Sequence, residues 1–577
     1  MVAPAAEAVA GRKTLPDECK TLWQIAGPVI LTGVFQFLID FVSVTVAFVG
    51  HIGKVELAAV SIVIGVIEGL GFGHTQQMVA PAAEAEAVAM AGRKTLPDEC
   101  KTLWQIAGPV ILTGVFQFLI GFVTVAFVGH IGKVELAAVS IVIGVIEGLG
   151  FGLLLGMGSA LETLCGQAVG AGQLHTLGVY MQRSWIICLA TAVALLPVYI
   201  FTDPILRLLR QSPEISAVAG RYARWCVPQL LAYAVNFPMQ KFYQAQSRVW
   251  VMTLISGAAV GLHALINWVV VARLRRGLLG AAMVGNASWW LINAAQFLYV
   301  VGGSFPEAWT GFSRKAFASL AGFVRLSLAS AVMLWFLLLL SLLPALIRSI
   351  YITDEILSIG VIFVLQLRDV VEFCCNSMNY NIWTLMVSVG FNAAVSVRVA
   401  NELGAKHPKA AKFSVVVAVA TSAAVGLVFT LVALLARKQL PRLFTDDELV
   451  VKEAAKLGYL LAATIGLNSI QPVLSGVAIG AGWQSLVAWV NIGCYYLIGL
   501  PLAAVLGFKL KLNATGIWVG MLIGTVLQTI ILFMILFRTK WHKEAMLAEV
   551  GQQQPESDPA QRHFGQWRKW HSYEGPV

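Results

Sequence analysis

The chain has 577 residues, of which only 12% are charged and 58% are hydrophobic, and its formal net charge is +10. Soluble globular proteins carry about twice that share of charged residues, because polar side chains must cover a surface that faces water. The composition therefore excludes a soluble enzyme and a disordered chain, and it predicts an all-α protein that crosses a membrane many times. We interpret the excess of Lys and Arg as residues at span ends, beside water and anionic headgroups, and we expect no nucleic-acid partner.

The first 152 residues contain one stretch of sequence twice. Residues 1–73 recur almost verbatim as 78–152, including GRKTLPDECKTLWQIAGPVILTGVFQFLI, with Asp40 replaced by Gly121 in the second copy. A match this close indicates a recent tandem duplication or a faulty gene model. We therefore interpret residues 1–77 as a spare copy that adds two N-terminal spans, and residues 78 onward as the working protein.

Apolar runs follow one another along the rest of the chain. A helix needs about 20 apolar residues to cross the hydrocarbon, because its backbone groups must all be bonded internally. The runs are continuous and do not alternate, which excludes a β-barrel. We predict twelve spans after the spare copy, at 102–129, 136–161, 184–202, 225–240, 249–272, 277–306, 326–347, 373–397, 413–436, two within 457–508, and 512–537.

The spans divide the chain into two halves of six. We predict a polar leader at 78–101, an N-lobe at 102–310 with spans one to six, and a loop at 311–325. A C-lobe at 326–540 holds spans seven to twelve, and a disordered tail follows at 541–577.

A second, fainter repeat relates these halves. Residues offset by 234 positions agree at several small residues and at one proline: Gly156, Ala160, Gly170, Ala171 and Pro238 recur as Gly390, Ala394, Gly404, Ala405 and Pro472. A repeat in the same order predicts two six-helix lobes with a central cavity between them.

The chain lacks the sequence patterns that would indicate an enzyme or an ATP-driven pump. It has no phosphate-binding G-x-x-x-x-G-K-[ST] loop, no H-E-x-x-H pair and no G-x-S-x-G serine turn. The remaining function for a chain that moves solute by itself is secondary transport driven by an ion gradient. We expect no cofactor, no resident metal and no catalytic residue.

One carboxylate lies in the middle of a predicted span. Glu147 follows Gly144 in the second span, and a charged side chain at this depth must face protein or water. We predict that Glu147 binds solute or the coupling ion, with a hydrogen-bonded packing role as the alternative. Glu162, nearer the end of that span, is expected at the water interface.

Neutral polar side chains inside the spans are the other site candidates. Amides and aromatic residues can line a cavity that accepts many solutes, and a proline inside a helix can bend it or form a gate. The alternative is that each amide only joins neighbouring helices. The candidates are Tyr233, Asn236 and Gln240 with Pro238, then Asn267, Asn293, Gln296 and Asn392, and finally Asn468 and Gln471 with Pro472.

Five stretches resemble the multidrug and toxic compound extrusion family, particularly its plant branch. They are LGMGSALETLCGQAVGAGQ (155–173), PMQKFYQAQSRV (238–249), NASWWL (286–291), VSVRVANELGA (395–405) and NSIQPVLSGVAIGAGWQ (468–484). The resemblance implies twelve helices in two lobes, alternating access, and antiport of organic solutes such as xenobiotics and secondary metabolites against H⁺ or Na⁺. It also implies a monomer in the vacuolar or plasma membrane, with the leader and the tail in the cytoplasm.

The chain departs from this family in its seventh span. After Leu334 the plant family usually continues with a glutamate that is regarded as a coupling carboxylate. In this chain, residues 335–377 do not resemble the family sequence. Asn468 stands where many relatives carry aspartate, and an amide cannot titrate. Outside this anomalous segment, Glu147 is the mid-span acid that remains, together with Asp40 in the spare copy.

Three other interpretations stay open at this stage. One is a lipid-linked flippase on a related two-lobed fold, and another is an integral-membrane enzyme acting on lipid or prenyl substrates. The third is an inactive product of a faulty gene model.

Overall fold

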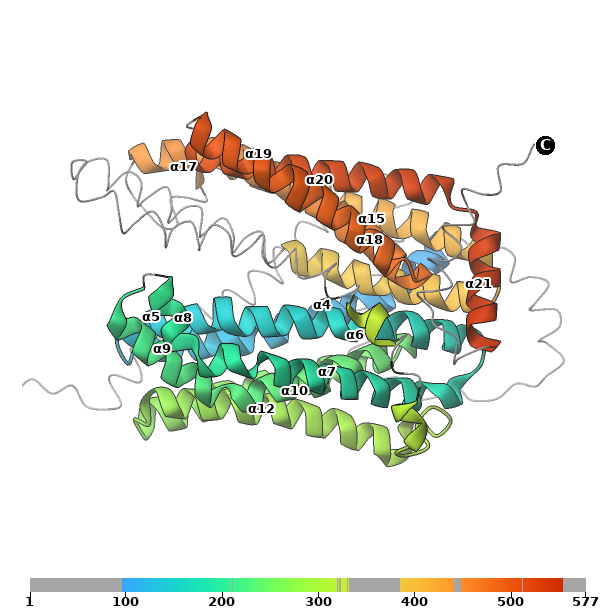
Figure 1. The fold of residues 1–577 in the computed structure, drawn as a ribbon, viewed down its shortest axis with the longest axis horizontal. Helices are drawn as coiled ribbons and strands as arrows, with labels where there is room; N and C mark the ends of the chain where they lie inside the picture. Colours follow the sequence, from blue (N-terminus) through green and yellow to red (C-terminus); the bar gives the residue numbers. More distant parts are fainter. Residues whose placement is uncertain are drawn as a thin grey trace, which may run out of the picture. The chain divides into compact units, whose positions relative to one another are not determined.

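A computed structural model describes residues 96–209, 211–318, 320, 323–328, 331, 384–439, 448–510 and 512–553 (Figure 1). The regular structure of these residues is entirely helical, which confirms the all-α class for the described part of the chain. The spare copy with Asp40, most of the seventh span and the end of the tail lie outside the described residues.

The names N-lobe and C-lobe are kept here for the two predicted halves of the chain. The described part of the N-lobe is built around helix α10. Its long helices are α4 (Leu96–Val128), α6 (Gly148–Gly170), α7 (Leu177–Ile200), α10 (Val227–Ala245), α11 (Val249–Asn267) and α12 (Gly277–Tyr299). Shorter elements join them: α5 (Lys133–Ile141), η1 (Val142–Glu147), η2 (Leu174–Thr176), α8 (Thr202–Leu208), α9 (Pro213–Trp225), η3 (Trp268–Arg273), η4 (Val300–Ser304) and η5 (Arg314–Phe317). Helix α10 packs against α6, α7 and α12, and α11 packs against α4 and α12.

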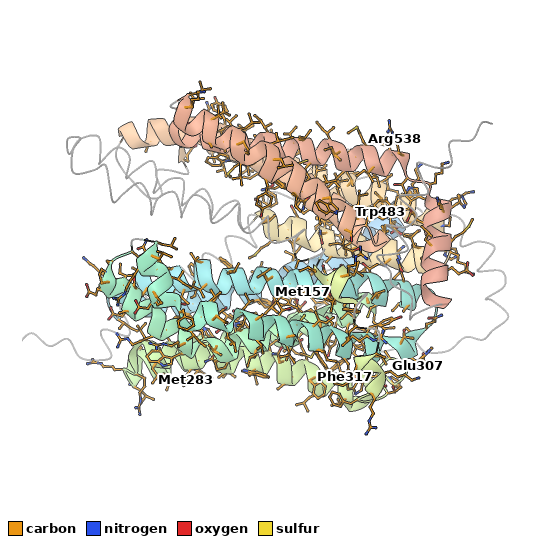
Figure 2. All side chains as sticks on the ribbon, in the orientation of Figure 1. Met157, Met283, Glu307, Phe317, Trp483 and Arg538 are labelled. Carbon is orange, nitrogen blue, oxygen red and sulfur yellow. The ribbon has the colours of Figure 1, made fainter. Side chains whose placement is uncertain are left out.

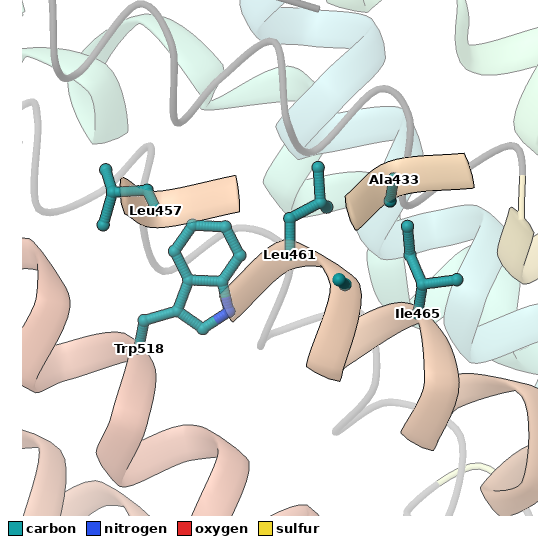
Figure 3. Packing of buried hydrophobic residues seen from close by; sticks show 6 residues of the cluster. Ala433, Leu457, Leu461, Ile465 and Trp518 are labelled. Atoms are coloured by element: carbon teal, nitrogen blue, oxygen red, sulfur yellow. The ribbon is translucent and has the colours of Figure 1, made fainter. Parts of the chain in front are cut away.

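Residues 323–328, at the start of the predicted C-lobe, are helical, and a helix over 384–404 follows among the described residues. The C-lobe continues with α15 (Pro408–Leu435), α17 (Glu448–Ala481), α18 (Gln484–Asn491), η6 (Ile492–Gly499), α19 (Leu500–Ala504), η7 (Val505–Lys509) and α20 (Asn513–Arg538). Helix α17 packs against α15 and α20. Between these three helices lies a buried apolar cluster that contains Ala433, Leu457, Leu461, Ile465 and Trp518 (Figure 3).

Eight helical stretches of the described chain are long and apolar enough to cross a membrane. They are Leu96–Val128, Lys133–Gly170, Leu174–Ile200, Val249–Arg273, Pro408–Leu435, Leu457–Ala481, Gln484–Gly507 and Trp518–Arg538. Helix α10, where the fourth span is predicted, is not among them. Fifteen of its 19 residues are nevertheless buried, because its polar side chains face neighbouring helices of the lobe.

The repeat at an offset of 234 is visible in the backbone. Helix α6 and the 384–404 helix occupy corresponding positions, and each is followed by a residue in the left-handed conformation. These residues are Gly172, with φ of 72°, and Lys406, with φ of 62°, which are themselves 234 positions apart (406 minus 172). A lysine adopts this conformation less readily than a glycine. The turn after the helix is nevertheless the same in both halves.

The start of the predicted disordered tail is a helix, and that prediction is wrong for residues 541–553. Helix α21 (Trp541–Gln553) buries Trp541, Ala545 and Ala548 along one face. It contacts α15 and α6. Spacings of three and four residues let the few apolar side chains of this segment share one helical face.

Candidate functional site

Glu147 lies at the end of the π-helical turn η1 and is 6% exposed. The Nε2 of Gln229 donates a hydrogen bond to its Oε2 at 2.9 Å, and the same amide donates to the hydroxyl of Tyr233 at 2.5 Å. The hydroxyl of Tyr233 and the thiol of Cys226 are further polar neighbours of the carboxyl. The carboxyl group therefore lies among neutral polar groups, and most of these belong to α10.

A second set of polar side chains surrounds Asn236, which lies 7 residues after Gln229 on α10. Its Nδ2 donates to Oδ1 of Asn293 at 2.9 Å, and its Oδ1 accepts from Nε2 of Gln240 at 2.5 Å. Gln240 also donates to Gln117 of α4 at 3.1 Å, and Asn293 donates to a backbone carbonyl of α10 at 2.8 Å. The structure thus brings three predicted residues together.

The two groups lie along one face of α10. Residues 229, 233, 236 and 240 are spaced by four, three and four positions, which places their side chains on the same side of a helix. This stripe meets η1 at Glu147, α12 at Asn293 and α4 at Gln117. The polar stripe therefore connects a buried acid to a network of amides within the N-lobe.

The remaining predicted amides of the N-lobe lie apart from this stripe's hydrogen bonds. Asn267 bonds to His263 at 2.9 Å, and His263 bonds to Ser288 at 2.8 Å, so these groups join α11 to α12. Gln296 is fully buried, and its side-chain amide has no hydrogen-bond partner among the described residues.

The predicted C-lobe residues make contacts within their own lobe. The Nδ2 of Asn392 donates to the carbonyl of Pro472 at 2.6 Å, which ties the 384–404 helix to α17. Gln471 is 1% exposed and donates to Ser475 at 3.1 Å, and Asn468 is half-buried. Like Pro238 in α10, Pro472 lies inside a continuous helix, so neither proline ends its helix.

Glu162 is not at the water interface, and that prediction is wrong. It is 0% exposed, and Nζ of Lys241 lies 2.6 Å from its Oε2. The prediction failed because α6 continues to Gly170 and packs there against the 384–404 helix, with Gly166 close to Ala400. Burial is tolerated because the carboxylate and the ammonium compensate each other's charge.

A second set of buried charges joins the two lobes. The Nε and Nη2 of Arg398 lie 2.9 and 3.0 Å from the two carboxylate oxygens of Glu99 in α4. The same Nη2 lies 2.6 Å from Glu402, and the hydroxyl of Ser414 donates to Glu99 at 2.5 Å. Sequence reasoning missed this set, although a cation inside the apolar run VSVRVANELGA is the signal that would have found it.

Glu147 differs from the other buried acids in its lack of a cation. Four acidic side chains of the described chain are buried: Glu99, Glu147, Glu162 and Glu402. Arg398 or Lys241 pairs with three of them. Among the described residues, no Lys, Arg or His forms an ion pair with Glu147.

The described residues contain no group of three or more His, Cys, Asp and Glu side chains that could hold a metal ion.

Comparisons with known proteins agree on one family. The MatE family model matches residues 109–269 and 376–505, one range in each predicted lobe. Protein DETOXIFICATION 33 of Arabidopsis thaliana is 50% identical over 460 residues, which cover 79% of this chain and 92% of the relative. Protein DETOXIFICATION 32 of the same organism is 50% identical over 455 residues, covering 78% and 85%.

Solved structures have the same fold. The eukaryotic MATE transporter AtDTX14 is 29% identical in sequence to this chain. Its crystal structure aligns with a TM-score of 0.73, covering 78% of this chain and 98% of that one. An outward-facing multidrug resistance MATE family transporter is 16% identical and aligns with a TM-score of 0.63, covering 76% and 95%.

Proposed function

Because this chain belongs to the MatE family of membrane transporters, we propose that it exports or sequesters organic solutes by antiport with H⁺ or Na⁺. Efflux transport across a membrane is the activity of the family, and its relatives and structural neighbours are transporters, not enzymes. The alternative of a membrane enzyme therefore falls away. The proposed solutes are xenobiotics and secondary metabolites, and the coupling ion is the one cofactor that the mechanism needs.

The proposed mechanism is alternating access between two six-helix lobes. The repeat at an offset of 234 supports it, because α10 and α17 occupy corresponding central positions, each beside the helix that carries the repeated glycines. We propose twelve spans from 102 to 540, with residues 1–77 dispensable for transport. The family match begins only at residue 109. We further propose a monomer in the vacuolar or plasma membrane.

We propose Glu147 as the coupling carboxylate. The observation that supports this role is its burial among Gln229, Tyr233 and Cys226 without a cationic partner in the described residues. A transporter couples to an ion when occupancy of a site changes which of its two states is favoured. Loss of a proton would leave a buried charge facing neutral groups, which is costly unless the lobe opens to water. The amides on the same face of α10 are the proposed contacts for solute.

The test is gradient-driven flux in proteoliposomes that contain the full chain. A fluorescent organic cation is loaded, and its exchange is followed after a pH gradient or, separately, a Na⁺ gradient is imposed. Glu147→Gln keeps the size and hydrogen bonds of the side chain but cannot titrate, so we expect it to lower pH-driven flux by at least about tenfold, the scale of 1.4 kcal/mol. Glu214→Gln is the matched control, because Glu214 is an exposed acid at the start of α9.

Each outcome has a distinct meaning. Flux in the wild type and the control, with loss in Glu147→Gln, supports the proposal. Equal flux in all three proteins would remove Glu147 from the coupling mechanism. Absence of gradient-dependent flux in the wild type would contradict antiport itself. Removal of residues 1–77 should leave wild-type flux unchanged.

A further inference from the structure

We propose that Glu99, Arg398 and Glu402 form a latch that holds the two lobes together and must open in each transport cycle. The inference rests on the proposed alternating access, and it adds the residues that stabilise one of the two states. The latch lies at the end of the molecule where α4 begins and where α6 and the 384–404 helix end. We call this the closed end.

The geometry of the latch is that of a strong, specific contact. Arg398 faces both oxygens of Glu99 at 2.9 and 3.0 Å, which is the bidentate arrangement that a guanidinium forms with a carboxylate. Glu402 shares the same guanidinium at 2.6 Å. Glu99 belongs to the N-lobe, whereas Arg398, Glu402 and the hydroxyl donor Ser414 belong to the C-lobe. The pair of Glu99 with Arg398 therefore crosses the interface, whereas the pair of Arg398 with Glu402 lies within the C-lobe.

The burial of these charges depends on the lobes being in contact. Glu99 is 1% exposed, Arg398 7% and Glu402 6%. Desolvation of three charges is costly, and it is offset only while their geometry is kept. Separation of the lobes at this end would return the carboxylate and the guanidinium to water, where each is well solvated alone. The latch can therefore hold the lobes firmly and still open without leaving a charge stranded in an apolar site.

Close backbone packing beside the latch sets its geometry. A Cβ added to Gly170 of α6 would collide with the carbonyl of Asn401, and one added to Gly404 would collide with the carbonyl of Gln167. Gln167 and Asn401 are themselves 234 positions apart (401 minus 167), so the two contacts are related by the internal repeat. The ring of Trp104 also packs edge-on against Phe391, with centroids 5.0 Å apart. These contacts bring the lobes close enough for the ion pairs to form.

The closing experiment measures the distance between the lobes in the full chain in lipid nanodiscs. Spin labels are placed at the exposed residues His175 and Lys409, one in each lobe near the closed end, through an encoded unnatural amino acid so that native cysteines stay. We expect one short distance in the wild type. Arg398→Ala should add a longer distance and raise the ratio of open to closed by at least about tenfold, because it removes the guanidinium that pairs with both carboxylates.

A control and a rescue separate the latch from general loss of structure. The double variant Glu162→Gln, Lys241→Met removes a buried ion pair of similar kind that lies inside the N-lobe, so it should keep the short distance. The double variant Glu99→Arg, Arg398→Glu restores two carboxylates around one guanidinium, and it should return most of the molecules to the short distance. Arg398→Lys keeps the charge but not the bidentate geometry, so it should raise the ratio by less than Arg398→Ala.

An unchanged distance distribution in Arg398→Ala, or an equal change in the Glu162, Lys241 control, would overturn the latch. If Arg398→Ala cannot be purified, Arg398→Lys decides, and an unchanged ratio in that variant overturns it. Gradient-driven flux is measured on the same preparations. Absence of flux in a wild type whose distances depend on Arg398 refutes the proposed antiport but not the latch, whereas normal flux with unchanged distances refutes only the latch.

Discussion

The two lobes have corresponding helices, but only the N-lobe has an ion pair between one corresponding pair of helices in the described residues. In the N-lobe, Glu162 and Lys241 form a buried ion pair between α6 and α10. The residues 234 positions later, on the 384–404 helix and α17, are Ser396 and Ser475, and both are buried. Glycine contacts such as those of Gly170 and Gly404 are kept in both halves. The comparison shows that the repeat preserves backbone packing, while the polar chemistry between the same helices is free to diverge.

The largest expected effect comes from breaking the ion pair on one side of this comparison. Lys241→Ala leaves Glu162 buried without a cation, which should lower the free energy of unfolding by about 3–5 kcal/mol. Ser475→Ala, at the corresponding C-lobe position, removes one hydrogen bond from Gln471 and should cost about 1 kcal/mol. The measurement is the thermal unfolding midpoint of each purified variant in the same detergent.

The double variant Glu162→Gln, Lys241→Met tests the cause of that loss. It removes both charges together, so it should recover most of the stability lost in Lys241→Ala. If the double variant is as unstable as Lys241→Ala, the packing of the lysine stem and not the stranded charge is responsible. Equal midpoints for Lys241→Ala and Ser475→Ala would remove the proposed difference between the lobes.

A smaller loss of stability should follow from adding a methyl group where α6 and the 384–404 helix pack backbone to backbone. Gly170→Ala and Gly404→Ala each push a Cβ against the backbone of the opposite lobe, and overpacking of this kind costs about 1–3 kcal/mol. Both variants should lower the thermal midpoint and lengthen the distance between labels at the closed end by similar amounts. Gly114→Ala is the control, because a Cβ there meets nothing within 4 Å. A large effect from one glycine alone would show that the contact is not symmetric.

The sequence predicts features that depend on residues close together along the chain. Apolar runs of sufficient length predicted helices that the structure contains, and the spacing of small residues predicted the corresponding positions of Gly170 and Gly404. Glu147 was predicted to face protein or water because a carboxylate in the middle of an apolar span is costly against lipid. The structure places it as expected, and its role in coupling stays a prediction.

The features that the sequence does not predict depend on partners far along the chain. Glu99 and Arg398 are 299 residues apart, and no local pattern pairs them. Lys241 and Glu162 lie on different helices, so each looks like an ordinary charge near a span end until α6 and α10 are packed together. The amides of α10 were predicted to line a cavity, whereas the structure also gives them hydrogen bonds between helices, which a single sequence cannot distinguish from contacts to solute.

The smallest expected effect concerns α21, which contacts both lobes and was not expected to fold. Its Glu544 accepts a hydrogen bond from the indole of Trp483 at 3.1 Å, and Trp541 packs near the same indole (Figure 2 labels Trp483). Glu549 forms a more exposed ion pair with Lys406 of the C-lobe at 2.6 Å. Burial raises the pKa of Glu544 above its ordinary value, and the Trp483 hydrogen bond and the charge of Lys543 oppose this shift only in part.

The raised pKa fixes the direction of a pH effect on docking. A carboxyl whose pKa is higher in the docked state binds its proton more tightly there, so its contribution is full below the ordinary carboxyl range near about 4 and is lost as pH rises through the raised pKa. Spin labels at the exposed residues Met546 and Lys409 should therefore give a narrower distance distribution at pH 5 than at pH 8. Glu544→Gln should remove the pH dependence, and its persistence in that variant would leave Glu544 with a packing role alone.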